Sequence, residues 1–524
     1  MTGRPKTASL YKKVGIASAI MMTSVLLSRF IGLLREAVIA YSGGAQAEVD
    51  AYQLAFVLPE FLNHLVATGF LSVTFIPIFN QYLVNDNEEE GWKSFSIIFI
   101  TFGSLLLGFI LILLIWTEPL VGLVAPGLKD MEVKALAVRM TRIVLPGQFF
   151  FFAGGLFMAV QFSKERFFIP ALAPLIYNTG IIIGGLALGP WIGMEGFSWG
   201  ALIGALAGNF ILQWFGASRS GMKFTLNLDL SHPDLRRYLL LTAPLMLGLS
   251  MTFSTEFLFR FFGSYLPKGT IASLNYGIRI MLVLVGLFGQ AIGSASFPFM
   301  SRLAAEGRMH EMNRLLNQTI RYLALVIPFS ALLIVLRYEV VYILFERGKF
   351  DAAATDLTSS LLPFLLVGAF AFSAQTVVVR GYYAMKETLF PSLFGTAAVL
   401  LSIPFFVAGM NLWGARGVAL GVSLSALFQA IILYILWNRR SSNLEGKRVF
   451  RRIGEMIFLS ILLGTILEVF KRTALFWFGH QGLIGALLTG VICSCLFLIL
   501  LYLAGKIFRI EEISGLLNKL IRKS

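Results

Sequence analysis

The strongest constraint on this chain is the recurrence of uninterrupted apolar stretches of about 20 residues along all 524 positions. A helix rises about 1.5 Å per residue, so each stretch is long enough to cross the roughly 30 Å hydrocarbon layer of a bilayer. Charged residues make up only 14% of the chain, against roughly 25% in a soluble domain. The stretches do not alternate in polarity, which argues against a membrane β-barrel. The sequence therefore predicts an all-α polytopic membrane protein.

Apolar runs separated by polar breaks predict fourteen transmembrane helices. They lie near residues 15–40, 52–83, 94–117, 135–162, 169–190, 195–216, 238–265, 270–300, 316–338, 357–385, 388–409, 414–437, 451–470 and 480–506. Basic residues concentrate in the loops on one side, most densely between Arg439 and Arg452. Because cytoplasmic loops carry an excess of Lys and Arg, we expect both termini in the cytoplasm.

The chain also repeats itself at a spacing of 221 residues without a gap. Pro77 is matched by Pro298, Pro170 by Pro391, Gly196 by Gly417, and Gly200 by Gly421. Each copy holds six predicted spans, an even number, so both copies enter the membrane in the same orientation. We therefore predict two parallel six-helix lobes, residues 1–220 and 221–441, around a central cavity. Residues 442–524 add two helices that the repeat does not contain.

Several charged residues lie inside the predicted spans, where each costs about 2.5–3.5 kcal/mol at the bilayer centre. The first helix carries Arg29 and Arg35, and the seventh and eighth carry Arg260 and Arg279. These are corresponding early helices of the two lobes, which we expect to face the cavity. The planar fork of arginine suits phosphate better than the point charge of lysine. The four arginines therefore predict a binding site for an anionic, phosphate-containing ligand.

An alternative explanation for some of these charges is pairing within a single helix. Arg35 is followed by Glu36, and Glu256 lies four residues before Arg260, the spacing at which opposite charges meet on a helix. Such pairs would stabilise a helix without binding any ligand.

Other function classes lack their sequence signals. The net charge of +15 lies mainly in particular loops, so it indicates membrane orientation and not a nucleic-acid partner. The two cysteines, Cys493 and Cys495, lie in the last span and make no metal-ligand pattern. Neither a phosphate-binding loop nor a catalytic carboxylate pair is recognisable. We expect no metal, no cofactor and no catalytic residue, and the sequence leaves open whether an ion drives transport.

Several motifs resemble those of one known family. Ser28–Glu36 (SRFIGLLRE) resembles the first-helix signature of the MurJ/MviN lipid II flippases, within the multidrug/oligosaccharidyl-lipid/polysaccharide exporter superfamily. The likeness continues through Asp50-Ala51-Tyr52, Phe75-Ile76-Pro77, Phe168-Ile169-Pro170-Ala171, and Glu346-Arg347-Gly348-Lys349-Phe350. It extends over nearly the whole chain.

This resemblance implies roles for particular residues. It implies that Arg29, Arg35, Arg260 and Arg279 bind the diphosphate of the substrate. It implies that Asp50 is a functionally sensitive acid, and we place Glu36, inside the first-helix signature, beside it as a second functional acid. The two C-terminal helices would form a groove for the polyprenyl tail.

Four positions depart from the family pattern. Asn63 stands where many relatives have a basic residue, and Thr68, Phe259 and Leu282 replace acids. The cavity of this chain would therefore differ in charge from that of its relatives.

The expected function is translocation of lipid II, the undecaprenyl-diphosphate-linked peptidoglycan precursor, across the bacterial inner membrane by alternating access. An alternative is a flippase for another polyprenyl-diphosphate-linked glycan, of O-antigen or exopolysaccharide type. A membrane-embedded glycan polymerase or ligase is a third reading, but the outer loops are short for an active site. Expected partners are the lipid-linked glycan, membrane lipids and the cell-wall synthesis machinery.

Overall fold

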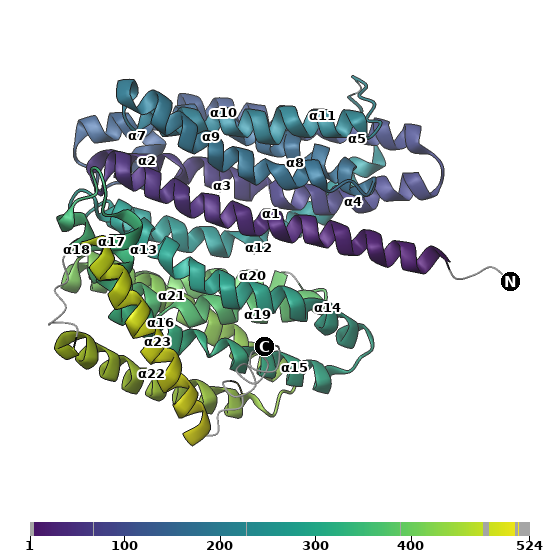
Figure 1. The fold of residues 1–524 in the computed structure, drawn as a ribbon. Coiled ribbons are helices and arrows are strands. Elements are labelled where there is room, and N and C mark those ends of the chain that lie inside the picture. Colours follow the sequence, from purple (N-terminus) through teal and green to yellow (C-terminus); the bar gives the residue numbers. More distant parts are fainter. Residues whose placement is uncertain are drawn as a thin grey trace. The chain divides into compact units, whose positions relative to one another are not determined.

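The computed structural model describes residues 5–66, 68–226, 228–387, 389–474, 482–508 and 512. Regular structure within these ranges is entirely helical, and the helices are labelled in Figure 1. The chain forms two compact units, Met1–Phe253 and Ser254–Ser524. The predicted lobe boundary at residue 220 and the separate role of residues 442–524 stay predictions.

Among its described residues, the first unit contains eleven α-helices, one π-helical turn (η1) and most of a twelfth α-helix that crosses the boundary between units. They are α1 (Pro5–Gly43), α2 (Ala47–Ala55), α3 (Val57–Val66), α4 (Thr68–Val84), α5 (Glu88–Ile115), α6 (Thr117–Val124), α7 (Met131–Val144), α8 (Gly147–Ser163), α9 (Phe168–Ile192), α10 (Glu195–Ala205), η1 (Leu206–Ile211), α11 (Leu212–Arg219) and α12 (Pro233–Gly263).

The second unit continues from the end of α12. Its elements are α13 (Thr270–Leu284), the π-helical turn η2 (Val285–Gln290), α14 (Ala291–Ala305), α15 (Met309–Leu323), α16 (Val326–Val335), α17 (Arg337–Phe345), α18 (Ala352–Leu366), α19 (Ala369–Ala384), α20 (Leu389–Trp413), α21 (Ala415–Arg440), α22 (Gly446–Ala474) and α23 (Leu483–Ile507).

Ten helices in the described ranges are long and apolar enough to cross a membrane. An eleventh span results if α18 and α19, which meet at 44°, are taken together. The predicted spans near 15–40, 52–83 and 238–265 coincide with α1, α2–α4 and α12, which lie outside that set. The structure thus confirms a multi-pass helical membrane protein, and the count of fourteen spans stays a prediction.

Two short helices, α6 and α17, were not predicted from the sequence. With eight and nine residues they are about 12–14 Å long, too short to cross a bilayer. Each lies between a long span and a loop that ends in an aspartate N-cap. Asp130 accepts hydrogen bonds from the backbone N–H groups of α7, and Asp351 accepts one from α18. The two caps are 221 residues apart, so the repeat extends to elements that the hydropathy pattern did not show.

The same spacing recurs in the backbone conformation of the helix connections. Four pairs of residues with positive φ are separated by 221 positions: Asp86 and Gly307, Glu165 and Lys386, Gly193 and Gly414, and Gly221 and Ser442. A positive φ is uncommon for residues other than glycine. Its recurrence at matched sites supports the repeat at the level of local structure.

Glycines allow the closest helix contacts in both units. In Figure 1, α9 and α10 lie side by side, and a Cβ added to Gly184 of α9 would lie only 2.3 Å from the Cα of Gly200 in α10. In the matching hairpin of α20 and α21, a Cβ on Gly417 would lie 1.8 Å from the carbonyl oxygen of Gly409. Small residues let membrane helices approach to backbone contact.

Aromatic and aliphatic cores hold each unit together. In the first unit, Phe75, Phe79, Trp92 and Phe95 are buried where α4 packs against α5. In the second unit, the last two helices pack inward, α22 against α16 and α23 against α17. Their shared core includes Leu463 and Phe497.

Candidate functional site

Arg35 forms the centre of a polar cluster within the first unit. Its Nη2 lies 2.5 Å from Oε1 of Glu36, and its Nη1 donates a hydrogen bond of 2.9 Å to Oδ1 of Asn178. The Glu36 side chain is only 3% exposed and that of Arg35 is 19% exposed. A guanidinium held by a buried carboxylate and an amide oxygen is well oriented, and part of it still reaches the surface.

The packing of α1 against α9 positions this cluster. The Ser24 hydroxyl of α1 donates to the carbonyl of Ala171 in α9. This contact lies about three turns of α1 and two turns of α9 before the contact between Arg35 and Asn178. The Asn178 amide nitrogen donates to the Pro174 carbonyl at 2.8 Å. Because that bond occupies the nitrogen, the amide oxygen is turned toward Arg35.

Arg29 lies six residues before Arg35 on α1, about 120° around the helix axis. Its side chain is exposed within the first unit, so the two arginines present their charges in different directions. Asp50 is buried in the first turn of α2, where the helix dipole favours a carboxylate.

The second unit contains Arg260 and Arg279. Arg260, near the end of α12, is 1% exposed, and its guanidinium carbon lies 5.3 Å from the centre of the Phe259 ring. This is the distance range of a cation–π interaction. Arg279 is partly buried on α13. Each unit thus carries two of the four predicted arginines, and their convergence on one ligand stays a prediction.

Asn178 contributes to the polar cluster around Arg35 through a contact that the sequence did not reveal. It contacts Arg35 across 143 positions. The available signal was a single amide side chain in an otherwise apolar run. Such a residue needs a hydrogen-bonding partner inside a membrane, but the run itself does not identify which one.

Within the described part of the chain, no group of three or more His, Cys, Asp or Glu side chains is arranged to hold a metal ion. Cys493 and Cys495 are not bonded to each other, and one is buried while the other is exposed.

Comparison with known proteins identifies relatives over most of the chain. A family described as lipid II flippase MurJ matches residues 39–487. The chain is 26% identical over 449 residues to a probable lipid II flippase MurJ of Bdellovibrio bacteriovorus, covering 84% of this chain and 85% of that one. It is also 26% identical over 495 residues to the Thermotoga maritima protein of the same description, covering 94% and 96%.

Solved structures share the fold. One described as lipid II flippase MurJ in an inward closed conformation is similar with a TM-score of 0.74 at 23% identity, covering 94% of this chain and 99% of that one. An inward-facing multidrug resistance MATE family transporter of the MOP superfamily is similar with a TM-score of 0.67 at 15% identity, covering 81% and 99%. Because the family match extends over most of the sequence and the fold agrees with it, this chain belongs to the MurJ family.

Proposed function

We propose that this protein is a transporter that moves lipid II from the inner to the outer leaflet of the bacterial cytoplasmic membrane. The observation that carries the proposal is the family match over residues 39–487. The cluster around Arg35 supports it, because an oriented and partly accessible guanidinium is a suitable ligand for a phosphate group.

In this proposal, Arg29, Arg35, Arg260 and Arg279 bind the diphosphate, and the two lobes alternate between inward-open and outward-open states. Glu36 balances part of the charge of Arg35. Four guanidiniums with one carboxylate carry about +3, and a diphosphate diester carries about −2. The empty site is then more positive than the loaded one. One charge moved across 100 mV is worth about 2.3 kcal/mol, so the membrane potential would favour return to the inward-open state.

The proposed orientation places both termini in the cytoplasm. The basic residues after α21 and at the start of α22 support it, since such residues accumulate on the cytoplasmic side. The polyprenyl tail would remain in hydrocarbon beside α22 and α23, whose outward side chains Phe458, Ile461, Ile484 and Val491 are exposed and apolar. Cell-wall synthesis enzymes are the proposed protein partners.

A second candidate function is transport of a different polyprenyl-diphosphate-linked glycan. The family resemblance implies an acid at the position of Phe259, whose ring centre lies 5.3 Å from the guanidinium carbon of Arg260. An aromatic ring in place of a carboxylate leaves Arg260 more positive, which changes the headgroup that the site would select.

Expression of the protein in cells depleted of their own lipid II flippase tests the proposal. We expect restored growth and labelling of lipid II at the outer leaflet. A matched pair of variants sharpens the test: Arg279→Ala should abolish rescue, whereas Arg302→Ala should retain it, because Arg302 is an exposed residue paired with Glu306. A membrane-inserted wild-type protein that exposes another glycan lipid, and not lipid II, would support the second candidate.

A further inference from the structure

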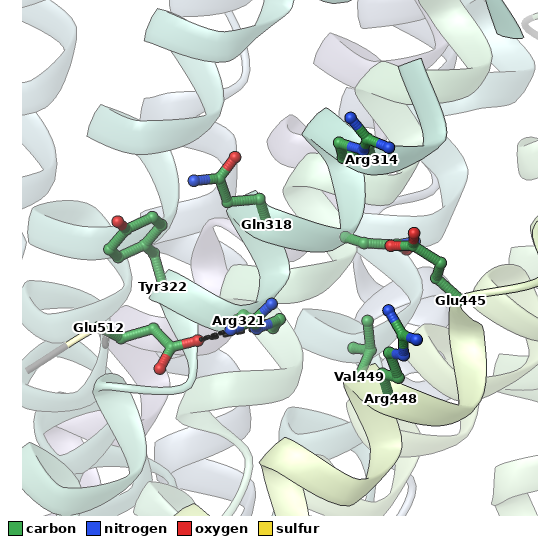
Figure 2. Close-up of a pocket in the computed structure, with 9 residues that line it drawn as sticks. Arg314, Gln318, Arg321, Tyr322, Glu445, Arg448, Val449 and Glu512 are labelled. Carbon is green, nitrogen blue, oxygen red and sulfur yellow. Dashed lines mark hydrogen bonds and ion pairs between the residues drawn. The ribbon is translucent and has the colours of Figure 1, made fainter. Parts of the chain in front are cut away.

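A polar cavity lies within the second unit, and none of the four arginines discussed above lines it. It occupies about 370 Å³ between α15 and the start of α22 (Figure 2). Three guanidiniums line it, from Arg314, Arg321 and Arg448, together with two carboxylates, from Glu445 and Glu512. The lining therefore carries a formal charge of +1.

The carboxylate of Glu512 is already neutralised. It is 3% exposed and lies 2.7 Å from Nη2 of Arg321 and 3.1 Å from Nη2 of Arg452, and Figure 2 shows the bond to Arg321 at the cavity wall. In contrast, among the described residues the guanidinium groups of Arg314 and Arg448 form neither an ion pair nor a hydrogen bond, although the backbone N–H of Arg448 donates to the Glu445 carbonyl and Arg314 interacts with Glu311 through its charge. Their side chains are exposed, so both are available to an anion entering the cavity.

An apolar cavity of similar size adjoins the polar one. It also measures about 370 Å³ and is lined by Phe288, Ile292, Leu315 and Leu325. Gln318 and Tyr322 line both cavities, so the two cavities adjoin at these residues. An occupant that fills both must be charged at one end and apolar at the other.

The position of the polar cavity along the spans agrees with such an occupant. The candidate span Met309–Val335 begins with the polar α15, and the span Gly446–Thr473 begins beside Arg448. The cavity thus lies where two spans start, at the level of lipid headgroups. Tyr322 lines both the polar and the apolar cavity, and tyrosines are enriched at the membrane boundary, where polar and apolar surroundings meet.

We propose that the polar cavity binds the phosphodiester headgroup of an anionic phospholipid, and that one acyl chain of the same lipid lies in the adjoining apolar cavity. Arginine forks bind phosphate oxygens with paired hydrogen bonds. A phosphodiester charge of −1 balances the +1 of the lining, whereas a diphosphate would leave an excess of negative charge. Free inorganic phosphate would leave the apolar cavity unfilled. The proposed ligand is therefore a lipid distinct from the transported one, and the inference is independent of the transport function.

Lipid binding to the purified full-length protein in detergent tests this proposal. Native mass spectrometry would compare phosphatidylglycerol with phosphatidylcholine of the same acyl chains, with inorganic phosphate and farnesyl diphosphate as competitors. We expect phosphatidylglycerol to bind about tenfold more tightly than phosphatidylcholine, the difference expected for charge-assisted contacts. The double variant Arg314→Gln, Arg448→Gln should lose this preference. The matched control Arg302→Gln, Arg439→Gln removes two exposed charges outside the cavity and should retain it.

Each alternative result has a clear meaning. If the double variant of Arg314 and Arg448 kept its preference for phosphatidylglycerol over phosphatidylcholine, or if the control variant lost that preference to the same extent, the assigned site would be wrong. Displacement of the lipid by inorganic phosphate would show a simple anion site, and displacement by farnesyl diphosphate would assign the cavity to diphosphates. A photoactivatable phosphatidylglycerol gives a second readout on the unaltered protein. It should label peptides from α15 and the start of α22, and labelling confined to other helices would contradict the proposal.

Discussion

The close contact between α9 and α10 leads to a quantitative prediction for a single methyl group. In the variant Gly184→Ala, the added Cβ would lie 2.3 Å from the Cα and 2.7 Å from the nitrogen of Gly200, and 2.8 Å from the carbonyl oxygen of Gly196. Carbon atoms normally approach to about 3.5–4.0 Å. All three obstructing atoms belong to the backbone, so no side-chain rotation relieves the overlap and the helices must separate by roughly 1 Å.

The magnitude follows from two opposing terms. Overpacking costs about 1–3 kcal/mol, and a backbone obstruction lies at the upper end of that range. Alanine in place of glycine in a helix returns about 1 kcal/mol. The net expected loss is about 2 kcal/mol. In the interior of α5, Gly108 has no atom within 4 Å of its added Cβ, so Gly108→Ala should show only the gain. The two variants should therefore differ by about 3 kcal/mol.

Titration of both purified variants with a denaturing detergent, followed by tryptophan fluorescence, would measure the apparent free energy of unfolding. Gly184→Ala should unfold at a lower denaturant fraction than the wild-type protein, and Gly108→Ala at an equal or higher one. Equal stability of the two variants would refute the proposed backbone contact between α9 and α10.

Three further perturbations follow from individual contacts. Asn178→Ala removes the amide that orients Arg35, and a hydrogen bond to a charged group contributes about 1.5–3 kcal/mol. The rate of lipid II flipping per inserted protein molecule should therefore fall. An unchanged rate would contradict this positioning role. Glu339→Gln removes the carboxylate that lies 2.7 Å from Nζ of Lys471. The free energy of unfolding in a detergent titration should fall by about 2 kcal/mol, less than the 3–5 kcal/mol of a fully buried ion pair, because the hydrogen bond from Lys471 to a backbone carbonyl remains. The additional change Lys471→Met should restore stability. Gly417→Ala should destabilise the protein more than Gly184→Ala, since its Cβ would approach a carbonyl oxygen to 1.8 Å. A smaller loss of unfolding free energy would argue that the hairpin of α20 and α21 is not packed like the hairpin of α9 and α10.

The long helices were predictable because a membrane span needs an unbroken apolar run. The break in the second predicted span was less evident. There, α2 ends at Ala55 and α3 begins at Val57, with Pro59 in its first turn. A proline ring clashes with the carbonyl four residues earlier, here that of Ala55, whereas in a first turn it is tolerated. The proline was visible in the sequence, but whether it bends or divides the helix depends on packing.

Contacts between distant segments were beyond the sequence. The four arginines were recognisable because charges are rare in apolar runs, whereas the bond between Arg35 and Asn178 depends on how α1 packs along α9. The polar cavity was missed for a related reason. Arg314 and Arg448 lie 134 positions apart in the sequence, and only the fold brings them to one cavity.

The most direct test of the central claim is lipid II translocation by the purified protein in liposomes. Labelled lipid II in the inner leaflet would be followed to the outer leaflet for the wild-type protein, Arg29→Ala, Arg279→Ala and the exposed control Arg302→Ala. We predict that the wild-type protein and the control translocate lipid II, and that both site variants are inactive although equally inserted. Translocation by Arg29→Ala and Arg279→Ala at the wild-type rate would contradict the assignment of these arginines to the diphosphate.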